Sequence, residues 1–489
     1  MKLINKILVG IATLGILTGC ENLDQEPYNA LPLKGTFRDF NDATAWHNVF
    51  YSSLRGTYSG MEKRTDIQSD LLNASIGWGN RDGQFHVWNF ESGATDVASA
   101  WKARYSNIAD INICIENFPK IPIHNATEQA KINVYLGEAY ALRAYYYLQL
   151  VQRFCVNYND NTKNTPELGL PLVLKYDITA MPSRSTLEET YNQIFSDIAR
   201  AKTLLATEAG RVGSLYLTID AVKAIEAKAL LAKQDYAQAY TVAASLVDSN
   251  RYPLTNDVNT LKKMWYQDAS NETILQLFTS ADELSGNFDH FLHYDEQKRV
   301  YAPDYIPSQW VINLYEDTDI RKGVYFEERP TLFNARSYRT KLVVKYPRGL
   351  YTKTSYAHAP KILRIAEQYL IAAEAAYKAG NENNAKNYLN ALRTARGVAN
   401  VTSTGADLFT DIKNERLREL AFEGFRLDDL KRWGDEVKRH DPQQLEYLMV
   451  SPSENFYTLQ KPATDYRFVW PIPEYDRQIN KNLKQNPGY

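Results

Sequence analysis

Two stretches with one shared internal spacing constrain the fold of this chain more than any other feature. Residues 362–397 carry apolar side chains every three or four positions in two runs, separated by the turn pair Gly380-Asn381, which predicts two antiparallel helices. Ala373 and Ala385 stand twelve residues apart in these runs. Small residues at such positions would let the two helices approach closely, as a tetratricopeptide-type hairpin requires.

The same design occurs earlier in the chain, at residues 222–247. Ala227 and Ala239 are again twelve residues apart, and Gln234-Asp235 supplies the turn. Two hairpins of one design predict an all-α-dominated fold of stacked tetratricopeptide-like hairpins, with long loop insertions and a few short strands. Two unrelated amphipathic hairpins are the alternative, because no regular period joins the two stretches.

Composition and the absence of known motifs exclude several classes of function. The 489 residues include 56 Lys and Arg against 58 Asp and Glu, so the chain has no excess of basic residues for nucleic acid. His290 and His293 are the only close histidine pair, and no HExxH or CxxC pattern accompanies them, so we expect no zinc. The sequence contains no GxSxG, Walker or dinucleotide-binding pattern. We therefore expect no cofactor and no enzymatic activity.

The N-terminus has the features of an export signal. Lys2 and Lys6 precede an apolar run at residues 7–17 that is too short to span a membrane as a mature helix. The run ends in Leu-Thr-Gly-Cys, which resembles the lipobox of bacterial lipoproteins. We expect cleavage of residues 1–19 and lipidation of Cys20, with an ordinary cleaved signal as the alternative. Each buried CH₂ of an acyl chain would add about 0.8 kcal/mol of membrane affinity.

The cysteines after position 20 are Cys114 and Cys155. Export permits a disulfide, but both residues lie within helical patterns, where a free cysteine behaves as a small hydrophobic side chain. We favour free thiols, with a disulfide between them as the alternative.

The C-terminal part of the chain carries two motifs of a known family. Residues 412–434 read IKNERLRELAFEGFRLDDLKRWG, and the chain closes with WPIPEYDRQINKNLKQNPGY at residues 470–489. Together these segments resemble the conserved C-terminal helix and the closing motif of the SusD/RagB family. The resemblance implies a single SusD-like domain over residues 20–489, with an N-terminal part at about 21–252 and a C-terminal RagB/SusD part at about 253–489.

The resemblance also implies a location, a partner and a function. Family members are lipoproteins on the external face of the outer membrane, where they act with a TonB-dependent, SusC-like transporter. We therefore expect this chain to bind an oligomeric nutrient, a glycan first, and to hand it to such a transporter without cleaving it. A peptide ligand of the RagB type is the alternative. Two alternatives belong to other functional classes: a structural lid that has no ligand of its own, and a glycan-degrading enzyme.

Carboxylates in the 412–434 segment raise the enzyme alternative, because glycoside hydrolysis uses two carboxyl groups across a cleft. Glu415, Glu419 and Glu423, however, follow one another at intervals of four along a predicted helix, among arginines. This pattern is typical of ion pairs on a helix surface. We interpret these glutamates as structural.

Two loop-rich insertions, at residues 60–100 and 253–361, are the candidate ligand-binding segments, because long ordered loops are usually functional. A glycan site needs aromatic rings beside polar side chains, and both insertions supply them if they leave the same edge of the scaffold. We expect Trp78→Ala to lower affinity at least tenfold, or about 1.4 kcal/mol, without changing the melting temperature. The candidate ligand-binding residues are Asp70, Asn73, Trp78, Asn80, Arg81, Asp82, Trp88, Tyr294, Tyr301 and Trp310.

Overall fold

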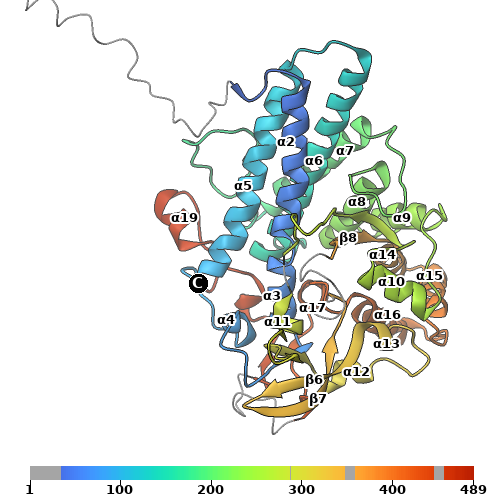
Figure 1. Ribbon diagram of the computed structural model, residues 1–489. Coiled ribbons are helices and arrows are strands. Elements are labelled where there is room, and N and C mark those ends of the chain that lie inside the picture. Colours follow the sequence, from blue (N-terminus) through green and yellow to red (C-terminus); the bar gives the residue numbers. More distant parts are fainter. Residues whose placement is uncertain (1–34, 287, 347–357, 445–455) are drawn as a thin grey trace, which may run out of the picture.

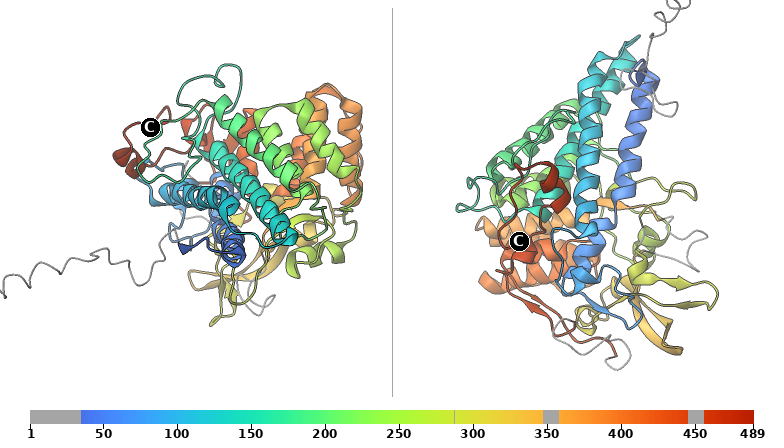
Figure 2. Two further views of the ribbon diagram at one scale, coloured as in Figure 1. Left: turned by 90° about the horizontal axis from the view of Figure 1, so that it is seen from above. Right: turned by 90° about the vertical axis from the view of Figure 1, so that its left-hand side faces the viewer.

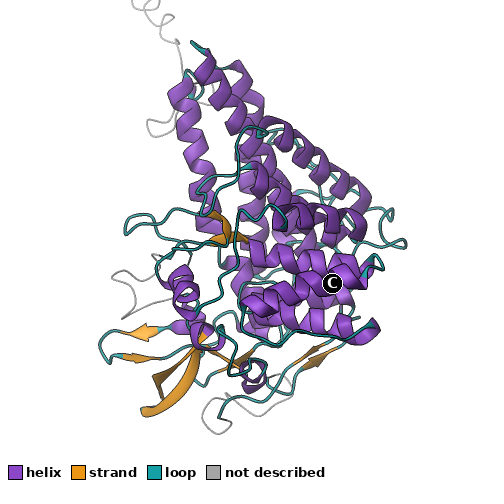
Figure 3. Cartoon of the chain, turned by 90° about the vertical axis from the view of Figure 1, so that its right-hand side faces the viewer, coloured by secondary structure: helices purple, strands orange, loops and turns teal. Residues whose placement is uncertain are grey.

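The computed structural model describes residues 35–286, 288–346, 358–444 and 456–489. The predicted leader, the lipidation site at Cys20 and the tether up to residue 34 lie outside these residues. Within them, no helix is both long and apolar enough to cross a membrane. Helices dominate the molecule. Most strands lie at the end of the molecule away from the start of the described chain (Figures 1 and 3).

A stack of antiparallel helical hairpins forms the scaffold of the fold. Each hairpin packs on the next, so that α7 contacts α8 and α9 contacts α14, and α16 then packs against α14 and α15. The hairpins and the closing helix are α6 (Ala126–Phe154) with α7 (Leu187–Leu204), α8 (Ile219–Lys233) with α9 (Tyr236–Val247), α14 (Ile365–Lys378) with α15 (Glu382–Ala395), and α16 (Gly405–Leu420).

The alanines singled out in the sequence lie where these helices meet. Ala227 and Ala239 share one buried cluster with Ala372 and Ala375 of α14, and all four are fully buried. The α14–α15 hairpin therefore stacks directly on the α8–α9 hairpin, and the small alanine side chains allow this close approach. A larger side chain in such a core costs about 1–3 kcal/mol. The prediction of a stacked helical scaffold is confirmed, and the alternative of two unrelated hairpins is wrong.

Polar caps set the limits of the scaffold helices. The Thr186 hydroxyl accepts from the Glu189 amide at 3.1 Å while the Glu189 carboxylate accepts from the Thr186 amide at 2.8 Å, which closes a capping box at the start of α7. Asp235 accepts from the Gln238 amide at the start of α9. Asn381 accepts from the Asn384 amide at the start of α15, directly after Gly380, whose φ of +81° turns the chain.

Two further helices pack against α6 of the first hairpin, and a third packs against a helix near the C-terminus. Helices α2 (Phe40–Thr57) and α5 (Thr95–Asn117) run beside α6, and α3 (Gly60–Gln68) follows α2 and packs against α17 (Arg426–Trp433) (Figures 1 and 2). Cys114 and Cys155 are buried and free, as favoured from the sequence.

In the described part of the chain, short strands of the insertions and of the C-terminal segment pair into four small sheets. The pairs are β1 (Leu72–Ala74) with β5 (Tyr305–Pro307), β2 (Thr273–Gln276) with β8 (Lys361–Arg364), and β9 (Val437–Lys438) with β10 (Gln460–Lys461), and the fourth sheet orders β3 (Tyr294–Asp295), β4 (Val300–Tyr301), β6 (Phe326–Phe333) and β7 (Arg336–Val343). Residues 362–364 were expected to begin a helix. They lie instead in β8, since β2 pairs with them.

Short helices lie in the insertions, in the C-terminal segment and directly after α5. They are η2 (Phe118–Lys120), α4 (Gly83–His86), α10 (Val258–Tyr266), α11 (Asp289–Leu292), α12 (Gln309–Asn313), α13 (Lys322–Tyr325), η4 (Tyr466–Phe468) and α19 (Glu474–Ile479).

The charged segment at residues 412–434 is two helices rather than one. Helix α16 ends at Leu420, and Phe422 and Gly424 adopt φ values of +66° and +84° before α17 begins. A Cβ on Gly424 would come within 2.7 Å of the Glu62 Cα, so the chain crosses α3 there with no room for a side chain. The even spacing of four along one helix therefore stops before Glu423.

Candidate functional site

The two loop-rich insertions meet in one antiparallel ribbon. Strand β1 of the first insertion pairs with β5 of the second, with Asn73 opposite Ile306 and Ala74 opposite Tyr305. The Ser75 amide extends the ribbon by donating to the Asp304 carbonyl at 2.8 Å. This pairing brings the two insertions together, as the predicted ligand site requires. We call the surface around β1, β5, Trp78 and Trp310 the lobe.

Trp78 leaves the ribbon as a half-buried aromatic residue. Its ring meets Phe456 edge to face at 5.4 Å, and His86 and Tyr305 lie at 6.1 and 6.3 Å. A Cβ on Gly83 would come within 2.6 Å of the Trp78 ring, so the α4 backbone packs closely against the indole. Removing this ring would leave a cavity, and this predicts a lower melting temperature for Trp78→Ala, unlike the sequence-based expectation.

Polar residues follow Trp78 on the same loop. Asn80 is exposed and adopts a φ of +58°. The Arg81 side chain is 54% exposed, and its guanidinium donates to both carboxylate oxygens of Asp304, which ties the loop to the second insertion. Asn80 is therefore an exposed polar residue on the Trp78 loop, and Arg81 is half-exposed but paired with Asp304.

Asp82 lies deeper than its neighbours. Its carboxylate accepts from the Arg64 Nε at 2.8 Å and lies 3.2 Å from the His290 Nε2. Burial alone would raise the pKa of Asp82, but His290, Arg64 and Lys63 outweigh it and hold the pKa well below its usual value. This carboxylate is engaged in ion pairs within the protein, and its role as a ligand-binding group stays a prediction.

Trp310 forms a second aromatic pair on the same lobe. Its ring stacks on His440 with centroids 4.0 Å apart and planes 16° apart. Asn73 is buried and donates from Nδ2 to the His440 carbonyl at 2.9 Å, so it positions this pair. Arg439 next in the chain donates to the Phe456 carbonyl at 3.5 Å, which links the Trp310–His440 pair to the Trp78–Phe456 pair.

Four other predicted ligand-binding residues belong to the core. Asp70 accepts two hydrogen bonds from Arg426, at 2.9 and 2.6 Å. Trp88 is 2% exposed, and its indole N–H donates to the Gln68 carbonyl. Tyr294 and Tyr301 are buried against each other, with ring centroids 4.9 Å apart. Their assignment to a ligand site is corrected, because all four side chains are buried.

Sequence reasoning missed the partners of the two tryptophans. Phe456 and His440 come from a segment that carried no recognised pattern, and both reach the site through contacts distant in sequence. No sequence signal marked His440. Phe456 lies near the closing motif at residues 470–489, which is the signal that could have drawn attention to it. Among the described residues, no group of three or more His, Cys, Asp or Glu side chains is arranged to hold a metal.

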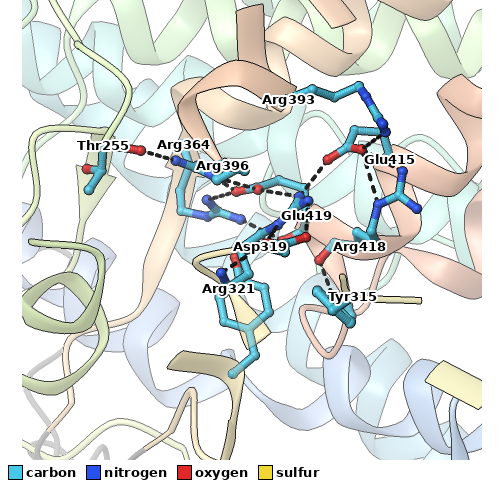
Figure 4. Close-up of polar contacts among 12 residues, drawn as sticks. Thr255, Tyr315, Asp319, Arg321, Arg364, Arg393, Arg396, Glu415, Arg418 and Glu419 are labelled. Carbon is cyan, nitrogen blue, oxygen red and sulfur yellow. Dashed lines mark hydrogen bonds and ion pairs between the residues drawn. The ribbon is translucent and has the colours of Figure 1, made fainter. Parts of the chain in front are cut away.

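Glu419 lies at the centre of a buried ion-pair network rather than in a cleft (Figure 4). Its carboxylate accepts from Arg321 at 3.1 Å, from Arg364 at 2.9 Å, and twice from Arg396 at 2.9 Å. Burial lowers the pKa of Arg396, but the Glu272 and Glu419 carboxylates outweigh burial and raise it above its usual value. These arginines are therefore charged, and each is paired with at least one carboxylate.

The neighbouring glutamates are engaged in the same way. Glu415 accepts from Arg393 at 2.9 Å and from Arg418 at 2.7 Å, and Glu423 accepts from Arg364 at 3.0 and 2.6 Å. The structural interpretation of these carboxylates is confirmed, but their predicted place on a helix surface is wrong, since they are buried. None is free to act as the acid or nucleophile of a glycosidase.

Comparison with protein families gives two matches along the chain. A model described as the SusD family matches residues 327–489, and one described as starch-binding and associating with the outer membrane matches residues 22–233. Two relatives from Formosa agariphila match over nearly their full length. SusD-like protein P38 is 23% identical over 98% of this chain and 97% of its own, and SusD-like protein P2 is 27% identical over 98% of both chains.

Solved structures have the same fold. A SusD superfamily protein from Bacteroides thetaiotaomicron superposes with a TM-score of 0.78 at 25% identity, covering 92% of this chain and all of the other. A laminarin-binding SusD-like protein superposes with a TM-score of 0.69 at 20% identity, covering 93% of this chain and all of the other. The helical scaffold, the C-terminal motifs and these matches at both ends of the sequence agree: the chain belongs to the SusD/RagB family.

Proposed function

We propose that this protein captures an oligomeric nutrient, a glycan first, at the outer surface of the cell and delivers it to a TonB-dependent, SusC-like transporter without cleaving it. The β1–β5 ribbon carries the proposal, because it joins the Trp78 loop to the segment that bears Trp310. Residues 20–489 act as one domain in this proposal, since a single buried cluster includes residues from Ala43 to Leu483.

The chemistry of the two aromatic pairs supports a glycan. Sugars have apolar C–H faces and a rim of hydroxyl groups, so a binding site needs aromatic rings with hydrogen-bonding groups beside them. Trp78 is followed by Asn80 and Arg81, and Trp310 lies on α12 beside His440. The similar fold of a laminarin-binding SusD-like protein supports the same ligand class.

Binding at this lobe should be weak for each contact. The aromatic rings are half-buried, and hydrogen bonds at an exposed surface contribute only about 0.5–1.5 kcal/mol each. An oligomer that reaches both aromatic pairs would gain affinity over a short ligand. We therefore expect longer oligosaccharides of one type to bind more tightly than shorter ones.

A ligand panel tests the proposal. The mature protein, Trp310→Ala and the matched control Phe278→Ala, an exposed aromatic residue of the second insertion outside the β1–β5 ribbon, are titrated with glycan and peptide oligomers by calorimetry. We expect at least one glycan to bind, Trp310→Ala to lower its affinity at least tenfold, and Phe278→Ala to leave it unchanged. Tight binding of peptides alone would replace the glycan with a peptide, and no binding at all would favour a structural lid.

Location and partner are tested separately. We propose that lipid on Cys20 holds the protein at the outer membrane, in keeping with a family described as associating with that membrane. Cys20→Ala should release the protein from the membrane fraction, and the released protein should still bind the ligand. A Cys20→Ala variant that stays fully membrane-bound would contradict the anchor.

A further inference from the structure

Exposed large apolar side chains gather in two segments on one side of the molecule. Ile178 is 81% exposed, Tyr475 is 70% exposed and Ile479 is 54% exposed. Single exposed apolar residues need no explanation, but a continuous patch of them marks a contact surface. The residues of this apolar patch are Leu174, Tyr176, Ile178, Met181, Tyr475 and Ile479.

Hydrogen bonds hold the two segments of the apolar patch together. Asn480 donates from Nδ2 to the Pro182 carbonyl at 2.8 Å, and Asn482 donates from Nδ2 to the Met181 carbonyl at 2.7 Å. Tyr475 and Ile479 are four residues apart on α19, so they share one face of that helix. The apolar patch is therefore one surface built from the loop before α7 and from the C-terminal segment.

The most exposed residue of the apolar patch sits on an ordered turn. Asp177 accepts from the Thr179 amide at 2.8 Å and from the Thr179 hydroxyl at 2.7 Å. This turn fixes the backbone at Ile178, and the Ile178 side chain points outward. The fold thus presents an aliphatic side chain to the outside through a defined geometry.

The chain enters the described structure at one end of the apolar patch. The Tyr176 amide donates to the Glu116 carboxylate at 3.1 Å, and the Phe37 ring lies 6.0 Å from the Phe118 ring, so both contacts fall at the C-terminal end of α5. Helix α19, at the other end of the patch, lies toward the start of α5, where the Glu474 amide donates to the Ser92 carbonyl at 2.9 Å (Figure 1). Fifteen residue steps separate Cys20 from Gly35, so a lipid on Cys20 would hold Gly35, where the described structure begins, within about 50 Å of its bilayer.

We propose that the apolar patch contacts the surface of the lipid bilayer. The inference rests on the anchoring at Cys20 in the proposed function, because the tether brings the patch to a membrane. Tyr and aliphatic side chains on protruding segments suit the boundary between headgroups and acyl chains. Lys175, Lys481 and Lys484 are exposed around the patch and have no ion-pair partner among the described residues, so they can reach anionic headgroups.

Vesicle flotation tests this contact without the lipid anchor. The chain from residue 21 lacks the leader and Cys20 but keeps every residue of the described core. It is mixed with vesicles of phosphatidylcholine and phosphatidylglycerol, beside the double variant Ile178→Ser/Tyr475→Ser. The matched control is Val258→Ser/Phe278→Ser, which removes exposed apolar side chains elsewhere.

We expect the unmodified chain and the control variant to float with the vesicles, and Ile178→Ser/Tyr475→Ser to lower the partition coefficient at least tenfold. All three proteins should bind the soluble ligand equally, which separates this test from that of the proposed function. Equal flotation of the patch variant and the unmodified chain would overturn the contact. Absence of flotation for the unmodified chain would also overturn it and leave a protein partner as the occupant of the patch.

Discussion

Replacing Glu419 by glutamine removes one negative charge from the centre of the buried network while keeping the side chain's shape. The carboxylate accepts four hydrogen bonds from Arg321, Arg364 and Arg396. In Glu419→Gln the amide NH₂ group would face guanidinium donors, and only one oxygen would still accept. The arginines cannot relieve the repulsion by losing a proton, since guanidinium groups stay charged in proteins.

The magnitude follows from the burial of these groups. Breaking a buried ion pair by removing one partner costs about 3–5 kcal/mol, because the other charge is left uncompensated. The entropy of unfolding, at about 2.1 cal/mol/K per residue, comes to roughly 1 kcal/mol/K for the 489-residue chain. A loss of about 4 kcal/mol therefore predicts a melting temperature about 4 °C lower.

Differential scanning calorimetry at neutral pH measures this shift. Asp407→Asn on the same helix is the matched control, because Asp407 is exposed near the start of α16 and should contribute at most about 1 kcal/mol through the helix dipole. An equal or smaller shift for Glu419→Gln than for Asp407→Asn would refute the view that the network stabilises the fold.

Three further predictions follow from single contacts. Burial raises the pKa of Glu415, but Arg321 and Arg418 outweigh burial and lower it to about 2. Its contribution to the stability of the fold is therefore complete above the unfolded pKa near 4.5 and is lost as the pH falls toward 2. Melting temperatures measured from pH 7 to pH 3 should be flat above pH 5 and fall below it, and a rise on acidification would contradict this. Gly424→Ala should cost more stability than Gly434→Ala in chemical denaturation, because both residues have positive φ but only Gly424 faces a neighbour within 4 Å, and equal losses would contradict the close approach. Trp78→Ala should lower both ligand affinity and the melting temperature, because the ring packs against Phe456 and the α4 backbone. An unchanged melting curve would show that the ring does not support the loop.

The hairpin scaffold could be predicted from sequence because its signal is local. The spacing of Ala373 and Ala385, with a glycine at the turn, requires only neighbouring residues, and the structure has that hairpin. Ile362 and Leu363 are apolar like the helix that follows, but they lie in β8, because β2, about ninety residues earlier in the chain, pairs with this segment. Periodicity over three residues cannot distinguish these outcomes.

The candidate site was harder to predict because composition does not report burial. Trp78 and Trp88 lie in one loop among similar residues, yet Trp88 is buried with its indole N–H bonded to Gln68, and Trp78 is half-buried at the lobe. The difference comes from the path of the loop, in which Trp88 adopts a φ of +54° and turns inward. The stacking of His440 on Trp310 depends on a contact between segments far apart in sequence.

The central claim is that the lobe at the β1–β5 ribbon binds an oligomeric nutrient and leaves it intact. Calorimetric titration of the mature protein and of Trp310→Ala with a set of glycan and peptide oligomers, followed by chromatography of the recovered ligand, tests it directly. The account predicts saturable binding of an oligomer, at least tenfold weaker binding by Trp310→Ala, and ligand of unchanged length after incubation. Binding that is unaffected in Trp310→Ala, or shortened ligand after incubation, would contradict it.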